Sequence, residues 1–270
     1  TQIEVLAPLV ARKAQPGQFI ILRIDEAGER IPLTIAGYDR EAGTITVIFQ
    51  KVGATTRRLG LLEEGDFLQD FVGPLGKPSD LEGKSGKKIA VVGGGLGIAI
   101  AYPQAKALHE VGAEVDVIVG FRNTSLFILT EELKAVCSRL FVMTDDGSNG
   151  HKGFVTDALE AQLKAGVRYD EVIAIGPLPM MRAVSKLTAE YNIPTVVSMN
   201  PIMIDGTGMC GGCRLTVGGQ TKFACVDGPE FDGHLVDFDE AIARSRMYRA
   251  EEAESMARHD DCNLLKGGPR

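Results

Sequence analysis

The chain has 270 residues, 44% of them hydrophobic and 24% charged, with a formal net charge of -7 and a pI near 5.2. This acidic balance argues against a surface for nucleic acid or for an anionic membrane, and no apolar run approaches the roughly 20 residues that a membrane span needs. We expect two domains with a small appendage, and partners that are proteins and small molecules.

Short apolar segments separated by turn residues predict a small β-barrel in residues 1–80. The expected strands are residues 3–10, 19–24, 33–38, 44–50 and 67–71. Turn signals at 16–17, 26–28 and 41–43 keep the loops between them short. Between residues 73 and 88 the sequence becomes polar and rich in Gly, Pro, Ser and Lys, which indicates a domain boundary.

Two stretches of the predicted barrel carry groups that suit a flavin. The segment from Arg30 to Thr34 offers an arginine fork for a pyrophosphate and a threonine hydroxyl for a ring nitrogen. The segment 52–56 offers a glycine, which lets backbone amides approach a phosphate, and two threonines. Each stretch alone is typical of barrel surface or of a hairpin turn. Followed by a dinucleotide-type domain, they predict a flavin at the domain interface.

Residues 86–199 alternate between strand and helix patterns. The expected strands are residues 89–92, 114–119, 140–143, 171–175 and 195–198, and the expected helices are residues 98–111, 131–137, 155–163 and 180–191. This alternation predicts an α/β domain with a doubly wound parallel sheet.

A glycine-rich turn at residues 93–97 lies between the first strand and the first helix of this domain. Exposed amides and the positive end of a helix favour phosphate at such a turn, although the same pattern also serves plain packing. The acidic residue that usually ends the second strand is missing, and Arg122 stands nearby. Arg122 suits a 2'-phosphate or a general ribose contact, whereas Asp145 or Asp146 suits an unphosphorylated ribose. We favour NAD(H).

Four residues near the end of the chain have the spacing of an iron-sulfur site. Asp205, Cys210, Cys213 and Cys225 reproduce the plant-type ferredoxin ligand spacing, with a carboxylate in the first position. Glycines between them let a short loop fold around a metal-sulfur core. We therefore expect a 2Fe-2S domain at residues 200–238.

Other interpretations of the cysteines stay open. Structural zinc is one, with Asp205, His234 or Cys262 as fourth ligand, and a redox dithiol is another. Cys262 also competes with Asp205 in the iron-sulfur interpretation, while Cys137 is expected to be a bystander. The five cysteines are an odd number and no apolar leader precedes residue 3, which predicts a cytoplasmic protein without disulfides. Residues 239–270 predict a charged helical tail, either plain surface or a docking element.

Taken together, these motifs resemble the ferredoxin-reductase superfamily of flavin and nicotinamide oxidoreductases, over nearly the whole chain. Within it, the sequence is similar to the branch that holds the dihydroorotate dehydrogenase electron-transfer subunits. It looks most like the small subunits of electron-bifurcating NADH-dependent reduced ferredoxin:NADP oxidoreductases, also known as sulfide dehydrogenase subunits. Two residues depart from the wider pattern: Ile175 replaces a common cysteine, and Asp205 replaces the first of four cluster cysteines. The second departure favours the bifurcating type over the dihydroorotate type.

The resemblance implies a role for each motif. It implies FAD contacts in the first motif and in the pyrophosphate loop, nucleotide contacts in the glycine turn and in two later loops, and cluster ligation in the cysteine loop. For FAD the residues are Arg30, Pro32, Leu33, Thr34, Gly53, Thr55 and Thr56; for NAD(H) they are Gly94, Gly95, Gly97, Arg122, Asp145, Asp146, Gly176, Pro177 and Met180; for the cluster they are Asp205, Cys210, Cys213 and Cys225.

The resemblance also implies a function and a partner. The chain would pass electrons between NAD(H), FAD and a 2Fe-2S cluster, with Thr34 near the flavin ring and no acid-base pair of its own, because the cofactors carry the chemistry. Its partner would be a larger subunit with a second flavin and 4Fe-4S clusters, in a heterodimer or a multimer of heterodimers. Two alternatives remain: a dihydroorotate dehydrogenase electron-transfer subunit, and a non-catalytic, zinc-bound assembly module.

Overall fold

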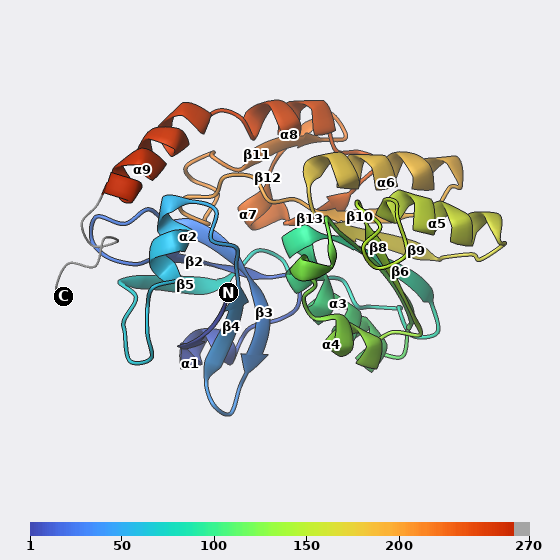
Figure 1. Ribbon diagram of the computed structural model, residues 1–270, viewed down its shortest axis with the longest axis horizontal. Helices are drawn as coiled ribbons and strands as arrows, with labels where there is room; N and C mark the ends of the chain where they lie inside the picture. The colour runs from blue at the N-terminus through green and yellow to red at the C-terminus, as the bar shows by residue number, and fades with distance from the viewer. Residues whose placement is uncertain (262–270) are drawn as a thin grey trace.

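Alternating apolar residues in the first part of the chain build a curled antiparallel sheet (Figure 1). It contains β1 (Gln2–Leu6), β2 (Phe19–Arg23), β3 (Ile31–Asp39), β4 (Thr44–Ile48) and β5 (Asp70–Leu75), in the order β1-β4-β3-β2-β5. Register shifts in the β2–β5 and β3–β4 pairs curve the sheet around its own core. The buried residues of this core include Ile20, Leu22, Ile45, Val47 and Phe49.

Two strand predictions in this domain were displaced. The first expected strand, 3–10, ends early because Pro8 begins a short helix, α1 (Pro8–Ala11). Proline lacks the amide that a strand needs but suits the first turn of a helix. The last expected strand, 67–71, runs instead over β5, while Phe67 is almost fully exposed. A further helix, α2 (Ala54–Leu59), lies between β4 and β5.

The second domain is a doubly wound sheet, as the alternation predicted. Its strands are β6 (Lys88–Gly94), β7 (Glu114–Phe121), β8 (Arg139–Thr144), β9 (Glu171–Ile175), β10 (Thr195–Ser198) and β13 (Glu230–Asp232), in the order β13-β10-β9-β6-β7-β8. All neighbours are parallel except β13, which runs antiparallel to β10.

Helices cover both faces of this sheet. The short turn η1 (Gly95–Gly97) leads into α3 (Ile98–Glu110), and α4 (Thr130–Ala135) follows η2 (Thr124–Leu126); α5 (Val155–Lys164) and α6 (Leu178–Glu190) lie on the other face (Figure 1). Ile89 and Val91 pack in the cluster with α3, whereas Ala90 and Val92 pack in the cluster with α5 and α6. Burial on both faces explains why the strands are apolar throughout.

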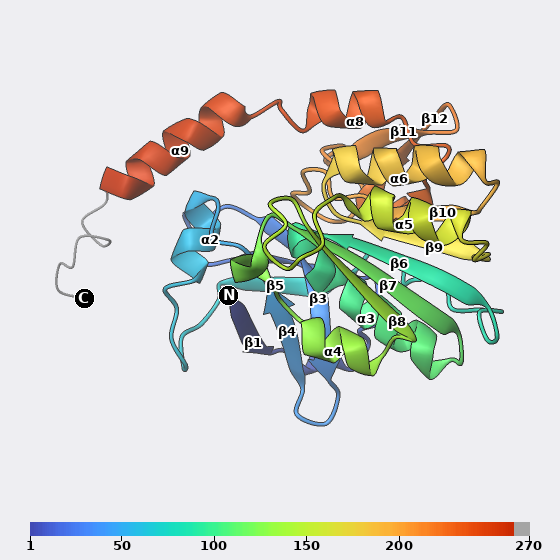
Figure 2. The same ribbon diagram turned by 45° about the vertical axis from the view of Figure 1, so that its right-hand side comes forward.

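The remaining segments run from the second domain back towards the first, which, among the described helices, only the last covers (Figures 1 and 2). They are the hairpin β11 (Arg214–Val217) and β12 (Gln220–Phe223), then α7 (Ala224–Asp227), α8 (Phe238–Arg244) and α9 (Arg249–Asp261). Helix α8 packs on α6 and β11, and α9 reaches α2, as Figures 1 and 2 both show. This computed structural model describes residues 1–261, so the final part of the predicted tail and Cys262 lie outside the described residues.

The barrel packs against the C-terminal segment through an apolar contact. Phe19 and Ile21 of β2 belong to the same buried cluster as Met203, Cys213 and Cys225. The amide of Lys77 also donates to the carbonyl oxygen of Gly228 at 2.7 Å. Within residues 1–261, none of the helices has the length and apolar character of a membrane span.

Candidate flavin, nucleotide and iron-sulfur sites

Two of the predicted cluster cysteines lie side by side in the interior. Cys213 precedes β11 and Cys225 lies in α7, each is 1% exposed, and their Sγ atoms are 3.2 Å apart. The Cys225 amide also points to the Cys213 Sγ, at 3.5 Å. Burial first, and then the neighbouring Cys213 thiol, raise the pKa of Cys225 to about 12. Two thiolates on one tetrahedral metal ion lie roughly 3.8 Å apart, so this pair is close to the spacing that a shared iron needs.

Asp205 and Cys210 form a second pair on the outer side of the loop. The Asp205 carboxylate accepts hydrogen bonds from the amides of Thr207 and Cys210, both at 2.8 Å. The amide of Thr207 first, and that of Cys210 with it, lower the pKa of Asp205, which keeps the group an anion. Cys210 itself is exposed. The carboxylate is therefore held in place by its own loop and stays ionised.

The loop that carries Asp205 rests on the barrel. Gly206 has a φ of +74°, and a Cβ there would lie 2.6 Å from Leu75 Cδ1 and 3.0 Å from Ile21 Cδ1. Only glycine satisfies both the left-handed backbone and this close approach. The cluster loop thus contacts β2 and β5 directly.

These four residues fit a 2Fe-2S core in type and pairing. Such a core takes two protein ligands on each of its irons, and thiolates are its preferred donors. No group of three or more His, Cys, Asp and Glu side chains is drawn together as a metal site in the part of the chain that the structure describes, so the two pairs remain separate. His234 lies elsewhere, with its Nε2 atom 3.1 Å from Thr188 Oγ1. Cys137 is half-buried, and burial is the main cause of its raised pKa.

The two predicted flavin loops meet at Glu29. The Thr55 hydroxyl, at the beginning of α2, donates to Glu29, which directly precedes Arg30. Arg30 in turn reaches Asp70 of β5 at 3.4 Å. A flavin phosphate would take the place of these carboxylates as acceptor. Sequence reasoning missed Glu29 and Asp70, because acidic residues beside a phosphate loop give no signal of their own.

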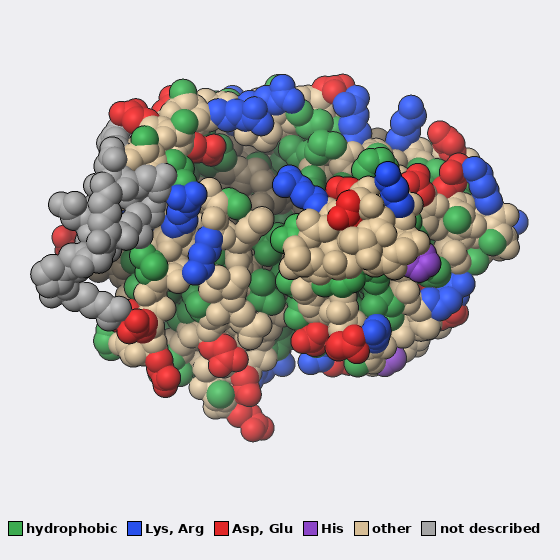
Figure 3. All heavy atoms as spheres, in the orientation of Figure 1, with side chains coloured by type: hydrophobic (Ala, Val, Ile, Leu, Met, Phe, Trp, Pro, Cys, Tyr) green, Lys and Arg blue, Asp and Glu red, His purple; other side chains and the backbone are tan. Residues whose placement is uncertain are grey.

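The other predicted flavin residues lie close to these two. Thr56 Oγ1 accepts hydrogen bonds from the amides of Val52 and Gly53, at 3.1 and 3.0 Å, and so shapes the beginning of α2. Pro32, Leu33 and Thr34 follow on β3, opposite Ile21, Ile20 and Phe19 of β2 in that order. In Figure 3 the surface is hollowed beneath the α8–α9 arm, and basic side chains lie on both sides of the hollow. Space and positive charge therefore lie together at this end of the barrel, which suits FAD.

The nucleotide residues meet at the carboxyl ends of β6 and β9. A Cβ at Gly97 would lie 2.4 Å from the carbonyl oxygen of Ile175, so only glycine lets the two segments approach so closely. Gly94 and Gly176 both border Met180, and Pro177 borders Gly94. A crevice at the carboxyl ends of parallel strands is where ligands bind in this sheet type. Gly95 faces open space there.

Arg122, Asp145 and Asp146 lie at the same edge, beyond β7 and β8. The amide of Asp146 donates to the carbonyl oxygen of Arg122 at 3.3 Å, and all three side chains are exposed. Hydrogen bonds from Ser148 lower the pKa of Asp146. The arginine and both carboxylates thus lie in the same region of the structure. The preference for NAD(H) over NADP(H) therefore stays a prediction.

The order of the modules defines the class of the protein. The chain has a curled antiparallel domain, then a doubly wound domain, and then a cysteine loop that contacts the first domain. This is the arrangement of a ferredoxin-reductase-like oxidoreductase. Residues 200–237 match the iron-sulfur cluster binding domain of dihydroorotate dehydrogenase B.

Relatives match nearly the whole chain. A "dihydroorotate dehydrogenase B (NAD(+)), electron transfer subunit homolog" of Thermotoga maritima is 47% identical over 93% of this chain and 88% of its own length. The electron transfer subunit of dihydroorotate dehydrogenase B from Bacillus caldolyticus is 35% identical over 83% of this chain and 87% of its own. One chain of a solved NADH-dependent reduced ferredoxin-NADP oxidoreductase, studied for flavin-based electron bifurcation, is 44% identical, with a TM-score of 0.89 over 95% of this chain and 92% of that one. The protein belongs to the family of dihydroorotate dehydrogenase B electron transfer subunits and their homologues.

Proposed function

We propose that this chain is the electron-transfer subunit of a flavin-based, electron-bifurcating NADH-dependent ferredoxin:NADP oxidoreductase. It moves electrons between NAD(H), FAD and a 2Fe-2S cluster. The chain is thus an NAD(H)-linked flavin and iron-sulfur oxidoreductase subunit, and the family membership supports this coarser statement directly.

The contact between the cluster loop and the barrel carries the proposal. Gly206 of the cluster loop touches Ile21 of β2, and Ile21 is the cross-strand neighbour of Pro32 in the first flavin motif. One strand therefore separates the predicted cluster ligand Asp205 from the predicted flavin residues. Electron transfer between a flavin and a cluster depends on such proximity, which supports the proposal.

Each group of residues has a distinct task in this function. When bound, FAD exchanges a hydride with the nicotinamide and single electrons with the cluster. Arg30 and Thr55 hold the flavin phosphates, and the turn 94–97 with Gly176 and Pro177 positions the nucleotide at the sheet edge. The buried pair Cys213 and Cys225 and the outer pair Asp205 and Cys210 hold the cluster, and the surrounding apolar side chains exclude water from its inner side.

The partner is a larger catalytic subunit, and we propose that it carries a second flavin and 4Fe-4S clusters. Cys210 lies at the surface of the cluster loop, next to Met209, which is 88% exposed. A cluster bound there has an outer edge from which electrons leave the chain. The complex would be a heterodimer or a multimer of heterodimers.

Isolation of the native complex without oxygen tests this function. We expect one FAD and two irons on this chain, visible absorbance that bleaches with NADH, and a larger subunit that contains flavin and further iron. A colourless chain with zinc and no flavin would instead make it an assembly module.

The family match at residues 200–237 favours a second candidate, the electron-transfer subunit of a dihydroorotate dehydrogenase. Both candidates share the same three modules, so the partner separates them. Copurification with a subunit that oxidises dihydroorotate, together with reduction of the chain's flavin by dihydroorotate through that subunit, would establish this alternative.

A further inference from the structure

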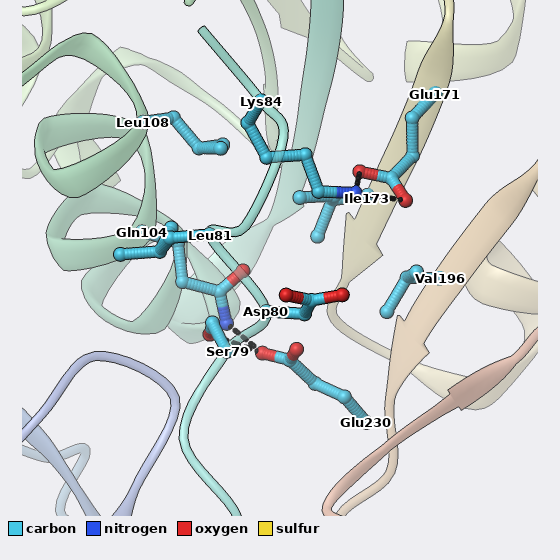
Figure 4. A pocket seen from close by; sticks show the side chains of 10 residues that line it. All are labelled: Ser79, Asp80, Leu81, Lys84, Gln104, Leu108, Glu171, Ile173, Val196 and Glu230. Atoms are coloured by element: carbon cyan, nitrogen blue, oxygen red, sulfur yellow. Dashed lines mark hydrogen bonds and ion pairs between the residues drawn. The ribbon is translucent and has the colours of Figure 1, made fainter. Parts of the chain in front are cut away.

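A cavity of about 90 Å³ lies away from the three cofactor sites, where the barrel, the linker after β5 and the nucleotide domain meet (Figure 4). Side chains from the linker, from α3 and from three neighbouring strands line it. They are Ser79, Asp80, Leu81, Lys84, Gln104, Leu108, Glu171, Ile173, Val196 and Glu230. Six of these ten side chains are polar or charged, and they come together at a partly open junction.

Gln104 has a buried oxygen that lacks a partner. The residue is 0% exposed, and its Nε2 donates to Glu230 Oε1 at 2.6 Å. Its Oε1 atom is buried and accepts no hydrogen bond from the described residues. In Figure 4 this oxygen is turned into the cavity. A buried amide oxygen without a partner is rare, and such an atom points to a bound donor or cation.

The cavity also has more negative than positive charge. Lys84 is its only basic residue, and both oxygens of Glu171 occupy it, at 2.9 and 2.8 Å. Asp80 and Glu230 therefore have no ion pair with any residue that the structure describes. Ser79 Oγ donates to Glu230 Oε1 at 2.6 Å, and the amide of Glu82 donates to Asp80 Oδ1 at 3.0 Å. Burial first, and then the charges of Glu171 and Asp80, raise the pKa of Glu230.

We propose that Gln104, Glu230 and Asp80 form a binding site for a hard divalent cation, with Ca²⁺ as the best match. Calcium takes six to eight oxygen ligands, drawn from carboxylates, amide carbonyl groups and water. Here two carboxylates and one amide oxygen border a space with room for the ion and roughly two waters. Thiol and imidazole ligands are absent from the lining, so a softer metal has no preferred donor.

The position of the site gives the ion a structural role. Glu230 lies on β13, Gln104 on α3 and Ser79 on the linker, while a Cβ at Gly17 of the barrel would lie 2.9 Å from Glu230 Oε1. The amide of Ser79 also donates to the carbonyl oxygen of Pro16 at 2.9 Å. An ion at this junction would fix the barrel against the nucleotide domain. Because a ligand that binds only the folded state stabilises it, binding should be visible as a rise in melting temperature.

The test uses the cofactor-loaded protein after dialysis against EGTA, at constant pH and ionic strength. We expect CaCl₂ to raise the melting temperature along a saturating curve, with one Ca²⁺ bound per chain in equilibrium dialysis. MgCl₂ should act only at higher concentration, and choline chloride should have no saturating effect. Visible absorbance, followed throughout, shows that the flavin and the cluster stay bound.

Three variants make the test specific. Glu230→Gln keeps an oxygen that accepts from Ser79 and Gln104 but removes a charge. Asp80→Asn changes an exposed residue and keeps an oxygen that can accept from the Glu82 amide. Both should weaken Ca²⁺ binding at least tenfold. Glu110→Gln, an exposed carboxylate on the same helix α3, should leave it unchanged. Absence of saturable binding to the unsubstituted chain, or equal binding by Glu230→Gln, would overturn the proposal and leave the cavity to ordered water.

Discussion

At the scale of single residues, Asp205 is the ligand candidate that differs most from its neighbours. Its carboxylate is already oriented by two amides of its own loop, whereas Cys213 and Cys225 are placed by burial. With Asp205 and Cys210 on one iron and Cys213 and Cys225 on the other, as predicted, the two irons would be unequal.

Asp205→Cys tests this assignment. We expect the variant to retain two irons per chain and to shift the midpoint potential of the cluster, because a thiolate is a softer donor than a carboxylate. Redox titration followed by visible absorbance measures the shift. Cys137→Ser, at a half-buried position away from the loop, is the matched control and should leave the potential unchanged. An unchanged potential in Asp205→Cys would assign the fourth ligand elsewhere, and Cys262→Ser would then be the next variant to measure.

Gly97→Ala tests the close approach of β6 and β9. A methyl group 2.4 Å from the Ile175 carbonyl oxygen must push the two segments apart, which we expect to cost about 1–3 kcal/mol of stability. It should also weaken NADH binding. Gly95→Ala is the comparison, because its Cβ meets nothing within 4 Å and only its φ of +56° opposes the change. Equal melting temperatures for Gly97→Ala and the unsubstituted chain would contradict the steric argument.

At the scale of elements, a buried polar network ties the amino-terminal ends of the sheet strands together. Asp116 of β7 is 0% exposed and binds Arg139 of β8 and the Tyr169 hydroxyl, the latter at 2.9 Å. Lys88 of β6 lies 3.9 Å from the same carboxylate. The network lies at the opposite end of the strands from the predicted nucleotide residues, so we expect it to act on stability.

Tyr169→Phe should therefore destabilise the protein without changing its chemistry. Removal of a hydrogen bond to a buried carboxylate typically costs about 1.5–3 kcal/mol. We expect a lower melting temperature with an unchanged rate of flavin reduction by NADH at 20 °C. A changed rate at full cofactor occupancy would show that the network also acts on the nucleotide site.

The element predictions succeeded where local sequence decides the structure. The apolar runs of β6, β7 and β9 and the helices between them followed from periodicity, since both faces of the sheet are buried. The edges failed where one residue overrides the pattern, as Pro8 does at the beginning of α1. The sequence did not predict β13, because this strand has only three residues and its structure depends on pairing with β10.

At the scale of the whole molecule, contacts between residues far apart in sequence join the segments of the chain. Gln104 and Glu230 are 126 positions apart and meet in one hydrogen bond, and Thr55 meets Glu29. Motif spacing predicted the cluster loop, the glycine turn and the flavin loops, but it carries no information about such long-range contacts. The roles of the individual site residues and the boundaries between the modules stay predictions.

The contact between the barrel and the cluster loop gives a prediction at this scale. Gly206→Ala should lower the iron content, because the added methyl group clashes with Leu75 and the φ of +74° is unfavourable for alanine. Leu75→Ala in the same chain removes the closest contact but leaves the approach to Ile21 and the backbone strain, so iron content should recover in part. Iron per chain, with FAD per chain as reference, measures both effects. Full recovery of the iron content would mean that the backbone conformation at residue 206 is unimportant. An unchanged iron content in Gly206→Ala would mean that cluster binding does not depend on this contact between the loop and the barrel.

The antiparallel strand β13 has a consequence for how this architecture can be rearranged by gene fusion or recombination. The polypeptide leaves the parallel sheet at β10, winds through the cysteine loop and returns to hydrogen-bond with that same edge. A truncation after residue 199 would remove the predicted cluster ligands. It would also leave β10 as an unpaired edge strand, and such strands favour intermolecular pairing. The cysteine segment therefore cannot be transferred by itself. A graft onto another reductase would also need an edge strand that pairs with β13.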